Sequence, residues 1–179
     1  IILSTAAQQY GGFTVPEVDK VLGPYAKKSY AKYKKEFMSY ADASWEGAEE
    51  KAKLYAMKKV RRDFDQGWQG IEYKLNTVGS SRGDYPFVTV TMGLGQEQFE
   101  KMCNISLLQV HQEGQGKPGS KKPVLFPKIV FLYDEAIHGA GKCCEDVFEA
   151  GVECSSKTMY PDWLSLSGEG YISEMYQKY

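Results

Sequence analysis

His138 has the sequence neighbours of an acid/base centre. Carboxylates flank this imidazole on both sides, at Asp134, Glu135, Glu145 and Asp146. Such a pairing can transfer protons at neutral pH. However, Gly139 and Gly141 lie in the same segment, and flexible glycines do not hold catalytic groups rigidly. We therefore expect a surface loop here in preference to a catalytic site.

Four cysteines could supply nucleophilic or redox chemistry: Cys103, Cys143, Cys144 and Cys154. Lys157 follows Cys154 closely and could activate its thiol, but no pattern places a general base beside it, so a packed helical cysteine is favoured. Cys143 and Cys144 match no metal or redox spacing and are expected to be incidental loop thiols. With two histidines and no Cys-x-x-Cys, we expect reduced thiols and no bound metal in this chain.

The segment Gly93-Leu94-Gly95 could present free backbone amides to a phosphate group. A dinucleotide-binding fingerprint also needs a third glycine and an acidic residue about twenty positions later, and the sequence lacks both. We interpret the segment as a tight turn between a strand and a helix, and we do not expect a Rossmann-type cofactor.

Two helical segments carry basic faces that could bind an anion. Residues 25–40 combine aromatic side chains with lysines, which predicts one aromatic and one basic face. In residues 45–76, a helical apolar spacing is formed by Val60, Phe64, Trp68, Ile71 and Leu75. The opposite face carries Lys51, Lys58, Lys59, Arg61 and Arg62. A solvated helix face is the favoured interpretation, and a site for an anion or a nucleotide phosphate is the alternative.

Residues 1–78 are predicted to be mainly helical. Ile1–Ala7 is typical of the end of an apolar helix. Thr14-Val15-Pro16-Glu17 has the spacing of a capping box, which predicts a short helix ending near Leu22. Gly23-Pro24 should separate that helix from the one over residues 25–40. Ser44 can cap the helix over residues 45–76.

Residues 79–179 are predicted to alternate strands and helices. The expected order is loop, strand, helix, strand, helix and extended piece, at residues 79–84, 87–91, 96–112, 123–131, 145–155 and 157–166. The run at 123–131 is nearly continuously apolar, as in strands buried on both faces. Strands separated by helices imply right-handed crossovers and a parallel α/β layer or barrel segment.

Composition excludes several classes of protein. The 179 residues suffice for one core, and 42% apolar with 25% charged residues are typical of a soluble globular domain. The net charge of -1 implies no nucleic-acid or anionic-membrane partner. No apolar run approaches the roughly 18 residues of a membrane span, and the first residues lack a signal-peptide pattern, so we expect a cytoplasmic protein. Both ends fall inside helical patterns, which indicates an internal piece of a larger protein.

Five blocks of the sequence can be compared with known families: Gln9–Gly12 (QYGG), Glu72–Thr77 (EYKLNT), Pro86–Val90 (PFVTV), Phe126–Phe131 (FPKIVF) and Glu153–Asp162 (ECSSKTMYPD). In order and approximate spacing they resemble the catalytic subunit of anaerobic, class III ribonucleoside-triphosphate reductase, a glycyl radical enzyme. One block alone is a weak signal, whereas five in register cover essentially the whole chain. The chain is therefore identified as an internal fragment similar to that subunit.

The resemblance implies an α/β fold, namely the first half of the ten-stranded α/β barrel of ribonucleotide reductases, with long covering helices. In that family the radical cysteine follows the block that corresponds to Met159–Asp162 and lies in a Met-Gly-Cys-Arg motif. The glycyl radical loop and zinc-binding cysteines lie further downstream, and a redox-active cysteine lies upstream. We therefore expect no catalytic residue and no metal ligand in this chain, and a structural role for Cys154.

The implied reaction converts ribonucleoside triphosphates to deoxyribonucleoside triphosphates for DNA synthesis. A thiyl radical removes the 3′ hydrogen of ribose, the 2′ hydroxyl leaves as water, and the sugar is then reduced. The implied partners are the substrate, ATP or deoxynucleotide effectors, a second copy of the subunit, and an iron-sulfur activating protein that uses S-adenosylmethionine to install the glycyl radical. Formate and a thioredoxin-type protein are both open as electron donors.

Effectors of this family bind beside the dimer interface, close to the helices around the Gln-Tyr-Gly-Gly block. By that analogy Gln9, Tyr10, Lys28 and Lys32 are expected to meet an effector's base or phosphates, since lysines supply the charge that a triphosphate needs. The residues 1–78 would form the effector and dimer-interface side, and residues 79–179 the barrel part. The alternative is a non-catalytic nucleotide-binding regulatory or structural module on the same scaffold.

Overall fold

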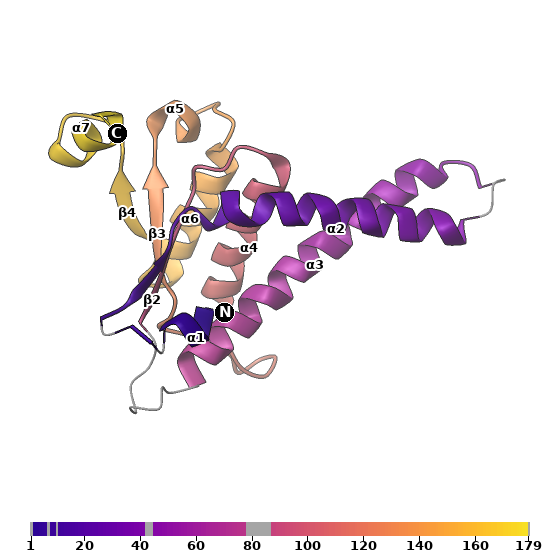
Figure 1. Ribbon diagram of the computed structural model, residues 1–179, viewed down its shortest axis with the longest axis horizontal. Coiled ribbons are helices and arrows are strands. Elements are labelled where there is room, and N and C mark those ends of the chain that lie inside the picture. Colours follow the sequence, from indigo (N-terminus) through magenta and orange to yellow (C-terminus); the bar gives the residue numbers. More distant parts are fainter. Residues whose placement is uncertain (1, 7, 10, 42–44, 78–86, 179) are drawn as a thin grey trace.

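The computed structural model is a parallel α/β layer (Figure 1). It describes residues 2–6, 8–9, 11–41, 45–77 and 87–178. Four strands lie side by side in chain order: β1 (Phe13–Val15), β2 (Val88–Met92), β3 (Lys128–Tyr133) and β4 (Asp162–Ser165). All three pairings are parallel, which confirms the predicted α/β class.

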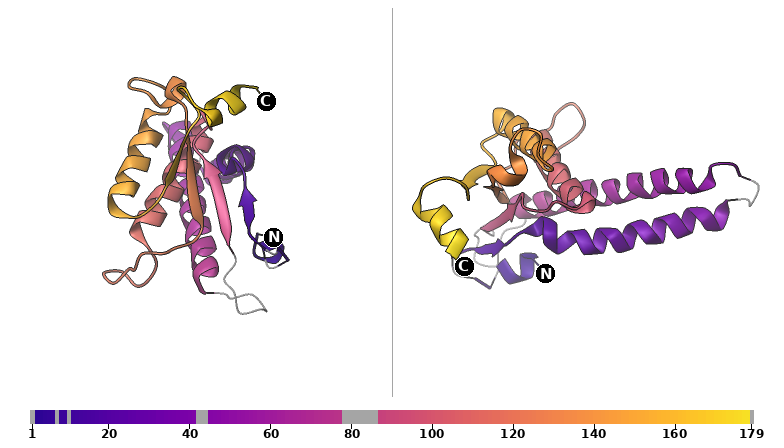
Figure 2. Two further views of the ribbon diagram at one scale, coloured as in Figure 1. Left: turned by 90° about the vertical axis from the view of Figure 1, so that its left-hand side faces the viewer. Right: turned by 90° about the horizontal axis from the view of Figure 1, so that it is seen from above.

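Seven helices accompany the strands in the described part of the chain. They are α1 (Ile2–Ala6), α2 (Val18–Tyr40), α3 (Ala48–Thr77), α4 (Gln98–Glu113), α5 (Glu135–His138), α6 (Glu145–Lys157) and α7 (Tyr171–Lys178). Helices α2 to α6 connect the strands, whereas α1 precedes β1 and α7 follows β4. Figures 1 and 2 show α3, α4 and α6 along the same side, and α4 contacts both of the others. Because successive strands are neighbours and their connecting helices share a face, the crossovers have one hand.

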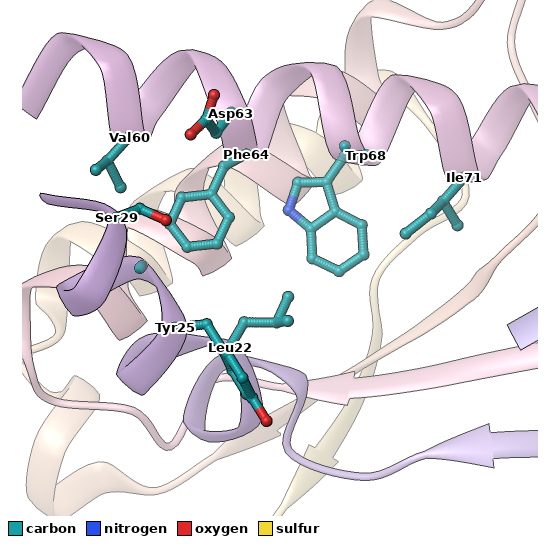
Figure 3. Close-up of a pocket in the computed structure, with 10 residues that line it drawn as sticks. Leu22, Tyr25, Ser29, Val60, Asp63, Phe64, Trp68 and Ile71 are labelled. Atoms are coloured by element: carbon teal, nitrogen blue, oxygen red, sulfur yellow. The ribbon is translucent and has the colours of Figure 1, made fainter. Parts of the chain in front are cut away.

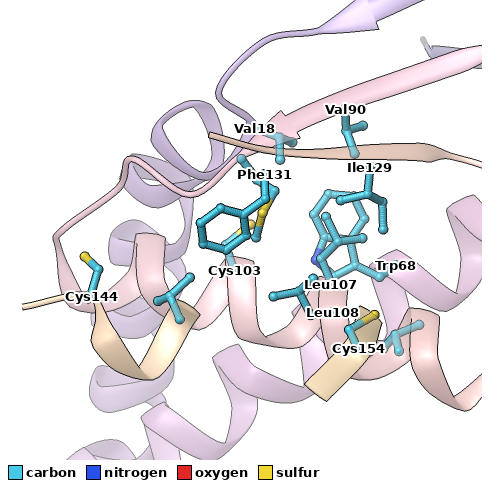
Figure 4. Close-up of a cluster of buried hydrophobic side chains, with 13 residues drawn as sticks. Val18, Trp68, Val90, Cys103, Leu107, Leu108, Ile129, Phe131, Cys144 and Cys154 are labelled. Carbon is cyan, nitrogen blue, oxygen red and sulfur yellow. The ribbon is translucent and has the colours of Figure 1, made fainter. Parts of the chain in front are cut away.

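The core lies between the sheet and these helices (Figure 4). Val90, Ile129 and Phe131 occupy alternate strand positions and are at most 2% exposed. They pack in one cluster with Leu107 and Leu108 of α4. Burying a side chain of this size contributes roughly 1.5–3 kcal/mol, so the sheet and helices stabilise each other.

The other face of the sheet carries a mixture of polar and apolar side chains. They are partly exposed and comprise Thr89, Thr91, Lys128, Val130, Leu132, Asp162 and Leu164. An ion pair of 3.0 Å joins Lys128 and Asp162 across β3 and β4. In the described part of the chain, the helices packed on the sheet lie on the opposite face. This face therefore lacks a covering layer within the described residues.

Expressed alone, the chain is expected to aggregate or to form a molten state. Val130 and Leu132 on the uncovered face, and the edges of the sheet at β1 and β4, would then meet solvent or other copies. Light scattering, binding of a hydrophobic dye and loss of near-UV circular dichroism measure this outcome. A sharp, cooperative melting transition of a monomer would contradict it.

The predicted capping box at the start of α2 is wrong. Thr14 and Val15 belong to β1, and α2 begins at Val18. The N-cap residue is Glu17, with φ of 42°, and its N–H donates to the Thr91 hydroxyl at 2.7 Å. Thr14 belongs to the sheet because it pairs with Thr89 of β2. A local spacing of residues cannot predict this pairing, because the two strands are distant in the sequence.

The predicted break at Gly23-Pro24 is also wrong, because α2 is continuous through both residues. Gly23 is buried against α4, and a β-carbon at this position would lie 2.6 Å from Glu100 Cγ. Pro24 cannot donate a helical hydrogen bond, and the close packing of α2 on α4 therefore compensates for the stability that is lost.

The second apolar strand is shorter at its start than predicted. β3 begins at Lys128 and not at residue 123. The backbone N–H groups of Leu125 and Phe126 each donate to Asn76 Oδ1 at 3.1 Å, so a side chain of α3 satisfies them in place of a strand. Part of the expected loop around residue 135 is the short helix α5. Ser44 and the predicted loop at residues 79–84 lie outside the described residues.

Candidate functional site

Helices α2 and α3 form a hairpin that extends beyond the sheet (Figures 1 and 2). Ala52 and Ala56 are fully buried, and such small side chains let the two helices approach closely. The Tyr33 hydroxyl donates to Asp63 Oδ2 at 2.7 Å and fixes the register of the pair. No helix of the described residues, these two included, is long and apolar enough to cross a membrane.

A cavity of about 290 Å³ lies between α2 and α3 near the sheet end of the hairpin (Figure 3). Its walls are mainly apolar or aromatic and consist of Leu22, Tyr25, Ala26, Ser29, Val60, Asp63, Phe64, Gly67, Trp68 and Ile71. Trp68 is 2% exposed, and its indole Nε1 has no hydrogen-bond partner within the described chain. This nitrogen is shielded from solvent, so the cavity offers mainly apolar and aromatic contacts. The cavity suits a flat group.

A stripe of exposed lysines runs along α2 beside this cavity. Tyr25, Lys28, Lys32 and Lys35 are spaced by three, four and three residues, which places them on one face of the helix. The ammonium of Lys28 lies 5.6 Å from the centroid of the Tyr25 ring. None of the three lysines has a carboxylate partner within the described residues, whereas the neighbouring Lys34 pairs with Glu49. This lysine stripe is therefore an unneutralised cationic surface.

The structure brings together two of the four residues expected to bind an effector. Lys28 and Lys32 lie one turn apart on the lysine stripe. Gln9 is exposed in the turn that follows α1, where its N–H donates to the carbonyl of Ala6 at 3.2 Å. Tyr10 lies outside the described residues. The cavity was not predicted from the sequence. Tyr25, three positions before Lys28 and therefore on the same helix face, could have indicated an aromatic wall beside the lysines.

The basic face of α3 does not assemble a phosphate site. Lys51 and Lys59 lie over aromatic rings, at 5.3 Å from Trp45 and 5.2 Å from Tyr55. Arg61 pairs with Asp65 at 2.8 Å and also donates to Gln109. The structure thus favours the interpretation of a solvated and internally paired helix face.

The glycine turn after β2 binds a carboxylate of the chain itself. Asp19 Oδ2 accepts hydrogen bonds from the N–H of Gly93 at 3.1 Å, the N–H of Gly95 at 2.8 Å and Asn104 Nδ2 at 2.9 Å. Asp19 is completely buried at the start of α2. These amides are therefore occupied, and the predicted tight turn between strand and helix is confirmed.

His138 is buried and structural, so the predicted surface loop is wrong for this side chain. It is 1% exposed, and Nε2 donates to the carbonyl of Gly93 at 2.9 Å. The N–H of Asp134 donates to Nδ1 at 3.0 Å. Burial lowers the pKa of His138, so the ring stays neutral and bridges two chain segments. Glu145, one of the four flanking carboxylates, accepts from the N–H of Gly141 at 2.8 Å.

Three of the four cysteines are buried: Cys103, Cys144 and Cys154. Burial raises the pKa of the Cys154 thiol, which packs in the core as expected for a structural residue. Within the described residues, no cluster of three or more His, Cys, Asp or Glu side chains could hold a metal ion.

A buried polar pair between α3 and α4 was not predicted from the sequence. His111 Nδ1 lies 2.9 Å from Glu72 Oε1, and the two side chains are 1% and 0% exposed. Gln115 Nε2 donates to the other carboxylate oxygen at 3.1 Å. This pair joins α3 to α4 and leaves no accessible group for catalysis.

Residues 1–178 match the family model described as anaerobic ribonucleoside-triphosphate reductase. The anaerobic ribonucleoside-triphosphate reductase of Enterobacteria phage T4 is 37% identical over 175 residues, which make up 97% of this chain and 27% of that protein. Proteins of the same name from Salmonella typhimurium and Haemophilus influenzae are 33% and 34% identical over 166 residues, 92% of this chain and 22% of each relative. The chain therefore belongs to the anaerobic ribonucleoside-triphosphate reductase family. It spans about a quarter of the length of these relatives.

Proposed function

We propose that this chain is part of an anaerobic, cytoplasmic ribonucleotide reductase that converts ribonucleoside triphosphates to deoxyribonucleoside triphosphates. The family match over residues 1–178 carries the proposal. A parallel sheet with its helices on one face is compatible with half of a ten-stranded barrel. The other half would cover Val130, Leu132 and the Lys128–Asp162 pair, and a closed barrel would shield radicals from solvent.

In this proposal the residues of the chain act as scaffold. Cys103 and Cys154 are buried in the core, and the described residues offer no cluster of metal ligands. Neither of these two buried cysteines fits a zinc site or an accessible radical thiol. We therefore assign the radical cysteine, the glycyl radical and the structural zinc to other parts of the protein, where the activating protein and the electron donor would also act.

An anaerobic assay tests the proposed activity. The intact protein is treated with an iron-sulfur activating protein and S-adenosylmethionine, and then supplied with a ribonucleoside triphosphate and with formate or a reduced thioredoxin-type protein. Chromatography is expected to show the 2′-deoxy product. A protein that binds nucleotides but yields no product with either donor would support the non-catalytic module instead.

We also propose that the lysine stripe and the adjoining cavity bind a nucleotide effector. The support is an unneutralised cationic surface beside a mainly apolar cavity with aromatic walls. The base would lie near Tyr25 and Trp68, and the phosphates would contact Lys28 and Lys32. Gln9 and Tyr10 stay candidates for contacts to the base.

The hairpin is also the proposed contact with a second copy of the chain. Its far end exposes apolar and aromatic side chains, with Tyr40 84%, Trp45 52% and Leu54 63% exposed. A second hairpin would cover them, because surfaces of this kind favour association. Sedimentation velocity of the intact protein measures the expected dimer, and a monomer at micromolar concentration would oppose it.

Replacing both Lys28 and Lys32 with alanine is expected to weaken effector binding by about 100-fold or more, since a hydrogen bond to a charged group contributes about 1.5–3 kcal/mol and two such bonds are lost. Isothermal titration with ATP and each deoxynucleoside triphosphate measures the change. Lys58→Ala is the matched control, because Lys58 is an exposed lysine on α3 away from the lysine stripe. Unchanged affinity in the double variant would remove both lysines from the site.

A further inference from the structure

The loop between α5 and α6 brings together two thiols that the proposed reaction does not use. Cys143 and Cys144 are adjacent in the chain, and their sulfur atoms lie 3.8 Å apart. Cys143 is exposed, whereas Cys144 is buried and directly precedes α6. A reagent can therefore reach the Cys143 sulfur first and meet the second sulfur within the same loop.

The geometry of the pair restricts what can join the two sulfurs. A disulfide needs sulfurs about 2.05 Å apart and usually Cα atoms about 4.4–6.8 Å apart. Adjacent residues across a trans peptide, as here, have Cα atoms only about 3.8 Å apart, so a direct bond would be strained. A tetrahedral metal ion needs further ligands, and the described residues supply no third one. An atom that bonds to both sulfurs, and that already carries its third substituent, needs neither a direct S–S bond nor a third ligand from the protein.

The surroundings hold the two thiols in place. Lys101 Nζ donates to the carbonyl oxygen of Cys143 at 2.6 Å, which ties the loop to α4. Cys143 Sγ lies 3.5 Å from Gln96 Oε1, and Cys144 Sγ lies 3.6 Å from the carbonyl oxygen of Gly95. These contacts are weak, so a stronger bond to sulfur can replace them, yet they keep both sulfurs on the same side of the loop. The pair is therefore preorganised for one bridging atom.

We propose that Cys143 and Cys144 form a binding site for monosubstituted trivalent arsenic compounds. In an organoarsenic(III) oxide, the arsenic carries one carbon substituent and one oxygen. The sulfur of Cys143 attacks the arsenic first, and the sulfur of Cys144 adds from the adjacent position. Two S–H bonds are replaced by two As–S bonds, and the oxygen leaves as one water molecule with both protons. Arsenic stays trivalent, so neither an oxidant nor a reductant is required.

The protonation of the buried thiol agrees with this order of steps. Burial, reinforced by the neighbouring Cys143, raises the pKa of Cys144 to about 12. Cys144 is therefore still a thiol when the first As–S bond forms, and its proton leaves with the oxygen. The second step is intramolecular, which gives it a large effective concentration of thiol.

Phenylarsine oxide is the probe that tests the site. The intact protein is reduced with a phosphine and titrated with the probe, and trypsin then cuts after Lys142 and Lys157 to release residues 143–157. One phenylarsenic group is expected on this peptide by mass spectrometry. The adduct should withstand excess 2-mercaptoethanol, but 2,3-dimercaptopropanol should remove it, because only a dithiol competes with a chelate.

Serine variants make the test specific to the pair. Cys143→Ser is expected to weaken binding by about 100-fold or more, since the chelate is lost. Cys154→Ser is the matched control because it changes the third cysteine of the same peptide, and it should keep the adduct. Cys143 is exposed, so its replacement leaves the core intact and the result remains decisive. Binding by Cys143→Ser equal to that of the unaltered protein, removal of the adduct by 2-mercaptoethanol, or its loss in Cys154→Ser would each overturn the proposal.

Discussion

Glu72→Ala is expected to lower the free energy of unfolding by about 3–5 kcal/mol, the range found when one partner of a buried polar pair is removed. Glu72 is completely buried, and its carboxylate accepts on both oxygens, from His111 at 2.9 Å and from Gln115 at 3.1 Å. Alanine would leave the buried His111 nitrogen without its acceptor, would leave Gln115 Nε2 with only the carbonyl of Gln69 at 3.3 Å, and would open a cavity between α3 and α4. Urea denaturation of the intact protein, followed by far-UV circular dichroism, measures the loss.

The control for this substitution is an ion pair of similar length on the surface. Glu50 and Lys53 are 2.7 Å apart on α3, with side chains 73% and 44% exposed. Glu50→Ala should leave the free energy of unfolding nearly unchanged, because water screens the pair and solvates the remaining ammonium. If Glu72→Ala were as mild as Glu50→Ala, the buried pair would not join α3 to α4 in the way described.

Asp19→Ala is expected to be similarly damaging, by about 3–5 kcal/mol, because three buried N–H donors lose one acceptor and each unsatisfied donor costs about 1–3 kcal/mol. The donors belong to Gly93, Gly95 and Asn104. The same carboxylate lies in the first turn of α2, where the helix dipole favours a negative charge. Amide hydrogen exchange at Gly93 and Gly95 is the most direct measurement, and it should become faster along with the loss of stability.

Two further variants separate the buried contacts from the helix dipole. Glu49→Ala removes an exposed carboxylate from the first turn of α3 together with its ion pair to Lys34, so its loss of stability is an upper bound on the dipole contribution and involves no buried donor. Asp19→Asn keeps the shape and one carbonyl acceptor, and it should lose less stability than Asp19→Ala. Equal exchange rates at Gly93 in Asp19→Ala and in the unaltered protein would show that the turn does not depend on this carboxylate.

Local sequence pattern located most of the secondary structure that surrounds the core. The alternating residues Val88 to Thr91 lie in β2, and the helical spacing from Val60 to Leu75 lies within α3. The glycine turn between strand and helix was also predictable, because it depends on neighbouring residues alone. Lys28 and Lys32 lie on one face of α2 for the same reason, since helical periodicity is a local property.

By itself, then, the sequence determined the α/β class, the alternation of strands and helices, and the blocks of residues that mark the family. Only the tertiary structure decided that β1 exists, that α2 runs through Pro24, and that a cavity opens between α2 and α3. It also decided that the Asp19 carboxylate accepts a hydrogen bond from the N–H of Gly95, which is 76 residues away in the sequence. The physical reason is that local periodicity reports which face of an element is apolar, whereas the partner of a buried polar group or a strand edge is selected by packing between distant segments.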